Sequence, residues 1–139
     1  MRVRWPALTL AGLFWCLYGD SAGFFRLGLL ASVLHEWGHV LAYRGMTGRW
    51  PRLCVDGLGI GLELASLELP PRRELILAAA GPAVNLLLAG LGWLWVVQVR
   101  AGYYPAFFAA ANLCVGAFNL LPVGELDGRR ILKLIFAAK

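Results

Sequence analysis

The residues with the clearest capacity for chemistry are His35, Glu36 and His39, in the sequence HEWGH at positions 35–39. On a helix, residues four apart share a face, so both imidazole rings can present a nitrogen to one metal ion. Glu36 leaves the helix about 100° away, where it can accept a proton from a water molecule at that ion. The chain contains two histidines, and both lie in this motif. The spacing therefore predicts a metal site with a general base beside it.

The motif lies within an apolar stretch, LLASVLHEWGHVLAYR. Hydrophobic residues make up 60% of the 139 residues and charged residues 15%, and the mean hydropathy is +0.67. A soluble domain is nearer about half apolar and about a quarter charged, so the composition indicates a membrane protein. Ionisable groups inside a membrane segment are expensive and usually functional. This favours a metal site over a chance match in which the histidines only make hydrogen bonds between helices.

Four apolar segments are expected to cross the membrane as helices. The predicted fold class is therefore an all-α multi-pass membrane protein, with one domain over residues 1–139 and spans at about 5–19, 22–43, 75–99 and 101–123. The first span is short for a hydrocarbon core of about 30 Å. With Arg2 and Arg4 before it and GDSAG after it, this segment also resembles a signal peptide. An uncleaved span is the favoured interpretation, because it would cover one side of the second segment.

The connections between these spans carry two further elements. In the loop 44–73, the apolar residues at 58, 60, 62 and 64 alternate with the period of a strand. They predict a small β or re-entrant element between the second and third spans. Because residues 58–64 are glycine-rich, we expect them to pair with the unwound backbone of a substrate, and a hairpin that only fills the loop is the alternative. After Pro122 we expect a turn and an amphipathic helix at about 129–138, on the membrane surface.

The basic residues predict the orientation of the chain. Of the 13 lysines and arginines, Arg26 and Arg100 fall on one side of the four-span arrangement, and the others fall on the opposite side. Basic residues accumulate on the cytoplasmic side of membrane proteins. Both termini and the opening of the active site are therefore predicted to be cytoplasmic in a cell membrane. The net charge of +5 does not point to nucleic acid, because no dense basic run is present. The three cysteines have no C-x-x-C spacing and indicate neither disulfides nor a cysteine metal cluster.

A tetrahedral metal site needs one more protein ligand beside two histidines and a water. Asp127 has the most favourable context, since it follows NLLPVGEL, where Pro122 ends a helix, and precedes Gly128, which permits a sharp turn. Unwound backbone at membrane depth is tolerated where it lines a watery cavity, as a hydrolytic site requires. The other candidates on the same side of the membrane are Cys54, Asp56, Glu63, Glu68, Glu74 and Glu125.

Three motifs in this order, HEWGH at 35–39, AGPAVN at 80–85 and NLLPVGELDGRR at 119–130, resemble those of the site-2 protease family of intramembrane zinc metalloproteases, in its compact bacterial and archaeal branch. The resemblance covers nearly the whole chain. It implies that His35, His39 and Asp127 bind Zn²⁺ and that Glu36 is the general base. It also implies that Asn85 and Asn119 hold the substrate or stabilise the oxyanion.

The expected function is that of a metalloendopeptidase which hydrolyses peptide bonds in or near the transmembrane segments of membrane proteins, as in regulated intramembrane proteolysis. Its expected partners are a transmembrane protein substrate and the lipid bilayer, with no nucleic acid; a homo-oligomer or a regulatory membrane partner is left open. The alternative is a catalytically inactive relative that binds and sequesters membrane helices. A metal transporter would need ligands along a path across the membrane, and both histidines lie in one cluster. Two histidines and a carboxylate could also hold a divalent metal other than zinc.

Overall fold

The computed structural model describes residues 6–56, 59–63, 69–99 and 102–137. Within them the chain forms five helices and one hairpin, in the order α1 (Pro6–Tyr18), α2 (Phe24–Thr47), β1 (Arg52–Asp56), β2 (Gly59–Glu63), α3 (Pro71–Val99), α4 (Tyr103–Asn119) and α5 (Asp127–Ala137). The prediction of a helical fold with a small β element between the second and third helices is confirmed for these residues.

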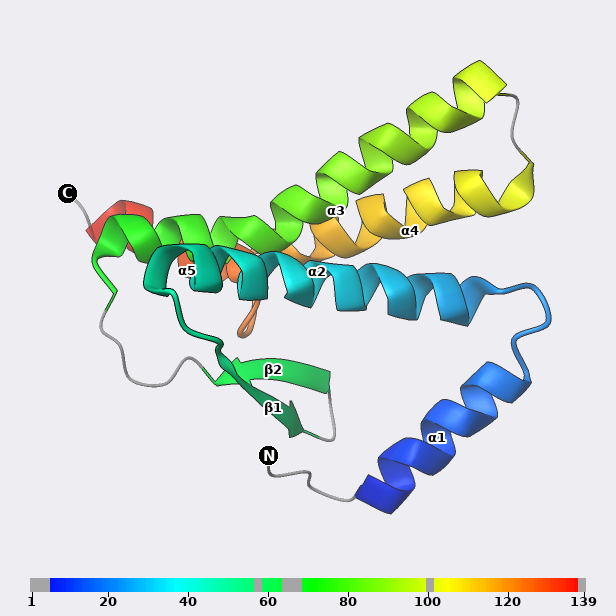
Figure 1. The fold of residues 1–139 in the computed structure, drawn as a ribbon, viewed down its shortest axis with the longest axis horizontal. Helices are drawn as coiled ribbons and strands as arrows, with labels where there is room; N and C mark the ends of the chain where they lie inside the picture. The colour runs from blue at the N-terminus through cyan, green and yellow to red at the C-terminus, as the bar shows by residue number, and fades with distance from the viewer. Residues whose placement is uncertain (1–5, 57–58, 64–68, 100–101, 138–139) are drawn as a thin grey trace.

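Three of the helices form the body that holds the site. In Figure 1, α3 and α4 run antiparallel as a helical hairpin, and α2 lies along them. The short helix α5 packs against the N-terminal end of α3, and α1 diverges from α2 beyond their connection. The metal-site motif on α2 and the segment that contains Asp127 therefore come together at one end of the body.

Small residues allow the helices of this body to approach closely. A Cβ atom at Gly38 of α2 would lie 2.8 Å from the carbonyl oxygen of Ala80 on α3, and one at Gly116 of α4 would lie 3.0 Å from the Cβ of Asn85. Both distances are shorter than van der Waals contact. Glycine at such crossings is typical of membrane helices, where close backbone packing has to replace the hydrophobic effect as the source of association.

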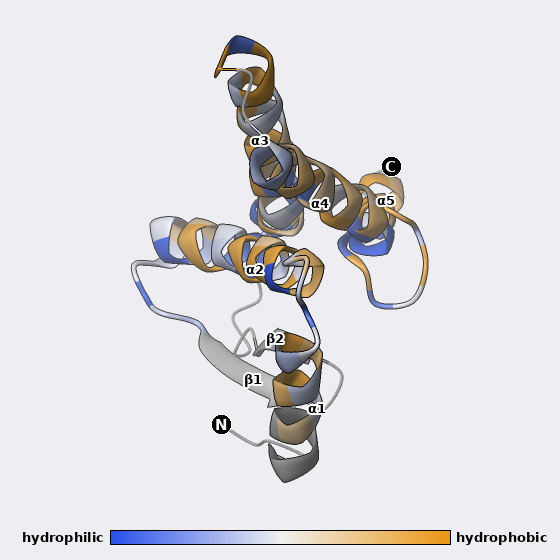
Figure 2. Cartoon of the chain, turned by 90° about the vertical axis from the view of Figure 1, so that its right-hand side faces the viewer, coloured by the Kyte–Doolittle hydropathy of each residue, from blue (hydrophilic) through white to orange (hydrophobic). Residues whose placement is uncertain are grey.

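The outer surface of the helices is largely apolar. Within the described residues, α3 is the one helix that is both long and apolar enough to cross a membrane. Its 29 residues span about 43 Å, against a hydrocarbon core of about 30 Å. Figure 2 shows hydrophobic residues along most of α3 and α4, and α3 exposes Leu86, Leu87, Leu91, Leu94 and Val97. That α1, α2 and α4 also cross the membrane stays a prediction.

The helix boundaries differ from the predicted spans for identifiable reasons. α2 continues to Thr47 rather than to 43, where Gly48 adopts a φ of 70° and donates its N–H to the carbonyl of Arg44 over 2.8 Å. This is the left-handed arrangement with which glycine often ends a helix. α3 begins at Pro71 rather than at 75, since proline is favoured in the first turn, where its missing N–H costs no hydrogen bond.

The connection between α4 and α5 is unwound, as the proline in it predicts. α4 ends at Asn119, and α5 begins at Asp127, two residues before the predicted start at 129. Gly124 turns the chain with a φ of 58°. Gly128 is buried against the carbonyl of Leu120, leaving no room for a side chain. The early start of α5 places the Asp127 carboxylate at a helix N-terminus, where negative charge is favourable.

The hairpin occupies part of the predicted strand-like loop. β2 covers Gly59–Glu63 and pairs antiparallel with β1, with Cys54 opposite Gly61. Leu58 and Leu64, the ends of the predicted strand, lie outside the described residues. Pairing of this segment with an unwound substrate stays a prediction.

Candidate metal centre

Two helices bring three potential metal ligands together. His35 Nε2 lies 3.0 Å from Asp127 Oδ2, and His39 Nε2 lies 3.2 Å from the same oxygen and 3.2 Å from His35 Nε2. Both histidines are buried, and the Asp127 side chain is 16% exposed. These are the residues that the spacing in HEWGH and the context of Asp127 predicted, and within the described residues they form one group with ligand spacing.

The outer nitrogen of each ring faces a hydrogen-bond acceptor. His35 Nδ1 lies 2.6 Å from Asn85 Oδ1, and His39 Nδ1 lies 2.8 Å from the carbonyl oxygen of Leu77. Because both partners are acceptors, each Nδ1 carries the proton and donates it. A neutral ring then has its lone pair on Nε2, which is the arrangement that a metal-binding histidine requires.

The chemistry of this donor set fits a metal ion. Two Nε2 lone pairs and a carboxylate oxygen are all acceptors, so they repel one another unless a cation, either a proton or a metal, lies among them. Zinc binds such atoms at about 2.0–2.2 Å, which places tetrahedral ligands about 3.3–3.5 Å from one another. The observed separations of 3.0–3.2 Å are close to that spacing.

The third ligand is ionised over the whole physiological range. Burial raises the pKa of Asp127, but the rings of His35 and His39 beside it, when they hold a proton on Nε2, outweigh burial and lower the pKa to about 2. The carboxylate therefore bears a negative charge at neutral pH, which offsets part of the charge of a divalent cation.

Gly81 provides the space in which the rings meet. A Cβ atom at this position would lie 2.7 Å from His35 Nε2 and 2.7 Å from His39 Cε1. Pro82 follows it and is also buried within α3. The glycine of AGPAVN is therefore a wall of the metal centre, a role that the sequence analysis did not assign to it.

An ion pair holds the segment with the third ligand against α3. Arg130 of α5 contacts Glu74 Oε1 through Nη2 at 2.9 Å and through Nε at 3.1 Å. Glu74 was a candidate third ligand. Its carboxylate instead pairs with Arg130 and positions α5, the helix that carries Asp127. The carboxylate at Glu125 is exposed on the α4–α5 connection.

No family model matches this chain, but individual proteins resemble it. A zinc metalloprotease of Methanocaldococcus jannaschii is 31% identical over 120 residues, which are 83% of this chain and 34% of that protein. Stage IV sporulation protein FB of Bacillus subtilis is 29% identical over 112 residues, 78% of this chain and 38% of that protein.

The solved structure of a site-2 protease from Methanocaldococcus jannaschii has a TM-score of 0.70 and 26% identity to the chain, and the match covers 96% of this chain and 64% of that one. The chain belongs to the site-2 protease family. It spans about a third of the length of the curated relatives, and about two thirds of the solved site-2 protease.

The three other residues with predicted roles in this site-2 protease homologue, Glu36, Asn85 and Asn119, differ in burial and in hydrogen bonding. Glu36 is half-buried on α2, one residue after His35. Asn85 is fully buried and bonds to His35, Ala31 and Asn112. Asn119 is half-buried and donates to Val115 of its own helix over 2.9 Å.

The remaining four candidate ligands belong to the loop between α2 and α3. Glu68 lies outside the described residues, and so do the side chains of Cys54, Asp56 and Glu63.

Proposed function

We propose that this chain is an intramembrane zinc metalloprotease, which hydrolyses peptide bonds in or near the transmembrane segments of membrane proteins. The observation that carries this proposal is the convergence of His35, His39 and Asp127, with Glu36 next to His35 on α2. It is supported by the zinc metalloprotease among its relatives and by the apolar outer surface of α3. The substrate, a transmembrane protein within the bilayer, is part of the proposal.

The residues of the site have two roles in hydrolysis, metal binding and proton transfer. His35, His39 and Asp127 would hold the metal. Bound zinc lowers the pKa of a water molecule toward about 7 and polarises a carbonyl group. Glu36 accepts the proton of the attacking water and returns it to the amine nitrogen that leaves, so one carboxylate serves as base and then as acid.

The two asparagines are suited to different tasks. Stabilising an oxyanion requires a free N–H donor. Both donors of the Asn85 amide are used, one on Ala31 and one on Asn112, so Asn85 has none left for a substrate. Asn119 uses one donor on Val115. We therefore assign the substrate contact to Asn119 and a role within the metal centre to Asn85.

The alternative, an inactive relative that sequesters membrane helices, would retain the fold and lose a ligand or the base. Here the base, Glu36, is present and the three ligand atoms converge. These residues favour the enzyme.

Glu36→Gln tests this function. General acid–base catalysis contributes about 10²–10⁴-fold to the rate, so cleavage should fall by that order. The metal content should not change, because Glu36 is not a ligand. Wild type, Glu36→Gln and the control Glu125→Gln, which changes an exposed carboxylate, are each co-expressed with a panel of single-span membrane proteins. Products are then compared on immunoblots.

Products that appear with wild type and Glu125→Gln, and not with Glu36→Gln, are the expected result. Equal cleavage by Glu36→Gln would contradict the role of the base. Stable complexes with intact membrane helices, without products from wild type, would favour the sequestering alternative.

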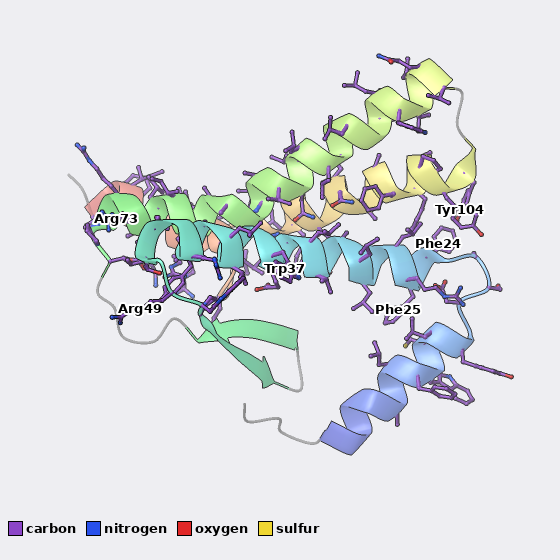
Figure 3. All side chains as sticks on the ribbon, viewed as in Figure 1. Phe24, Phe25, Trp37, Arg49, Arg73 and Tyr104 are labelled. Carbon is purple, nitrogen blue, oxygen red and sulfur yellow. The ribbon has the colours of Figure 1, made fainter. Side chains whose placement is uncertain are left out.

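We also propose that the metal centre opens toward the cytoplasm. Figure 3 shows Arg49 and Arg73 at the end of the bundle where α5 lies, and Phe24, Phe25 and Tyr104 at the opposite end. Arg49 and Arg73 therefore lie at the end that the charge bias of the sequence predicts to be cytoplasmic. Arg2, Arg4, Arg100 and Lys139 of that bias lie outside the described residues.

Single cysteines test this orientation in a variant without Cys16, Cys54 and Cys114. A cysteine at Gly102 should react with an impermeant maleimide in intact cells, whereas cysteines at Arg49 and Glu125 should react only after the cytoplasmic face is opened. The reverse pattern would place the metal centre on the outer face.

A further inference from the structure

Buried side chains from three helices form a chain of hydrogen bonds that ends on His35. Asn112 of α4 donates from Nδ2 to the carbonyl oxygen of Phe108 over 2.9 Å. Asn85 of α3 donates from Nδ2 to Asn112 Oδ1 over 2.9 Å and to the carbonyl oxygen of Ala31 over 3.0 Å. His35 of α2 donates from Nδ1 to Asn85 Oδ1 over 2.6 Å. Both asparagines have 0% exposure, so water does not compete for these bonds.

The direction of every bond in this chain is determined by backbone carbonyls. A carbonyl oxygen can only accept, so Asn112 must turn its Nδ2 toward Phe108 and its Oδ1 toward Asn85. Asn85 must then turn its Nδ2 toward both Asn112 and Ala31. The acceptor Oδ1 of Asn85 is therefore directed at His35, and the ring must carry its proton on Nδ1.

The opposite orientation would disable the ligand. If the amide of Asn85 turned over, its Nδ2 would face His35 Nδ1, which would then have to accept. The ring proton would move to Nε2, the atom that lies 3.0 Å from Asp127 Oδ2, and no lone pair would remain there for a metal. His39 does not need such a chain, because its Nδ1 is held by the backbone carbonyl of Leu77.

We propose that Asn112 is a positioning residue of the metal centre, which acts through Asn85 to keep the proton of His35 on Nδ1 and its Nε2 available to a divalent metal. The proposal rests on the proposed function in one respect, that His35 is a metal ligand. Asn112 contacts neither the metal ligands nor a substrate position among the described bonds, so it influences the site only through the orientation of Asn85.

The first test is the zinc affinity of the purified protein, measured by competition with a chelator. Loss of an outer partner of a metal-binding histidine usually weakens metal binding by about 10–100-fold. We expect the upper end of that range for Asn85→Leu, which removes the acceptor next to His35. Asn112→Leu should fall near the lower end, because Ala31 still holds Asn85.

Two further variants serve as controls. Asn85→Asp keeps an oxygen acceptor toward His35 and should bind zinc more tightly than Asn85→Leu. Asn119→Leu replaces another asparagine of α4 by leucine, as Asn112→Leu does. Asn119 donates to its own helix, so this variant should keep the zinc affinity of wild type. If Asn112→Leu does not fold, Asn112→Asp is measured in its place. The aspartate keeps an acceptor for Asn85 and loses the donor to Phe108. Its loss of zinc affinity should be smaller than that expected for Asn112→Leu.

The second test reads the proton on His35 directly. The chain has two histidines, so protein labelled with ¹⁵N-histidine and purified without a histidine tag has two Nδ1–H signals by NMR. Asn112→Leu should shift the signal of His35 and leave that of His39 in place, because His39 donates to the backbone. The signals are recorded with and without zinc, and neither readout depends on proteolysis, so a protein that cuts no substrate would leave this result intact.

Two outcomes would overturn the proposal. If Asn112→Leu, or Asn112→Asp in its place, keeps both the wild-type zinc affinity and the His35 signal, Asn112 does not act on the ligand. If the signals of His35 and His39 shift together, Asn112 supports the fold as a whole rather than the tautomer of one ring.

Discussion

Gly81→Ala is expected to remove the bound metal while α3 stays helical. The added Cβ would lie 2.7 Å from His35 Nε2 and 2.7 Å from His39 Cε1, where van der Waals contact requires more than 3 Å. Neither ring can retreat freely, since Asn85 and Leu77 hold the two Nδ1 atoms. Alanine is more favourable than glycine in a helix interior by about 1 kcal/mol, so the substitution stabilises α3 itself. The steric overlap costs about 1–3 kcal/mol, and it is relieved by displacing the rings of His35 and His39.

Elemental analysis of the purified protein measures this effect. Metal content should fall from about one ion per chain to about a tenth of that or less, since two ligands are displaced at once. Gly90→Ala is the matched control, because Gly90 lies in the same helix and a Cβ there meets nothing within 4 Å. Circular dichroism should be the same for both variants. A Gly81→Ala protein with full metal content would contradict the assignment of Gly81 as a wall of the centre.

The ligands could be predicted from the sequence because their signals are local. His35 and His39 have the spacing of one helical face, and α2 is helical over both. Asp127 was favoured by Pro122 and Gly128, whose effects on the backbone hold in any fold. The structure brings these three side chains together. The zinc that they would bind stays a proposal.

The surroundings of the ligands could not be predicted in the same way. Whether Asn85 faces a substrate or His35 depends on how α2, α3 and α4 pack, and the motif AGPAVN does not encode that packing. Asn112 accepts a hydrogen bond from Asn85 of α3, and nothing in the sequence around Asn112 indicates that Asn85 in turn contacts a metal ligand. The contact of Gly81 with the rings arises from the same three-helix packing.

The hairpin shows a second limit of sequence reasoning. β2 was predicted from alternating apolar residues, whereas β1, with the sequence RLCVD, was not. Five residues with a central cysteine carry little periodicity of their own. Their strand conformation depends on pairing with β2, which is a tertiary contact.

Asp127→Ala is expected to lower metal content from about one ion per chain to near background, because two histidines alone leave a zinc site one protein ligand short. The substitution also removes the one carboxylate among the three converging ligand atoms, and with it the charge that favours a cation there. α5 should persist, since Arg130 and Glu74 hold it to α3 through a separate ion pair. Asp127→Asn, which keeps the size and loses the charge, should retain part of the metal.

Glu125→Ala and Asp56→Ala complete this experiment, with metal content again measured by elemental analysis. Glu125 is exposed two residues before Asp127, so its loss should leave the metal content at the wild-type value. Asp56 is a candidate ligand of the loop whose side chain lies outside the described residues, and Asp56→Ala tests it as the third ligand. Normal metal in Asp127→Ala together with loss of metal in Asp56→Ala would move the third ligand from the start of α5 into the hairpin. The opposite pattern is expected, because Asp127 Oδ2 already lies within 3.0–3.2 Å of both ring nitrogens.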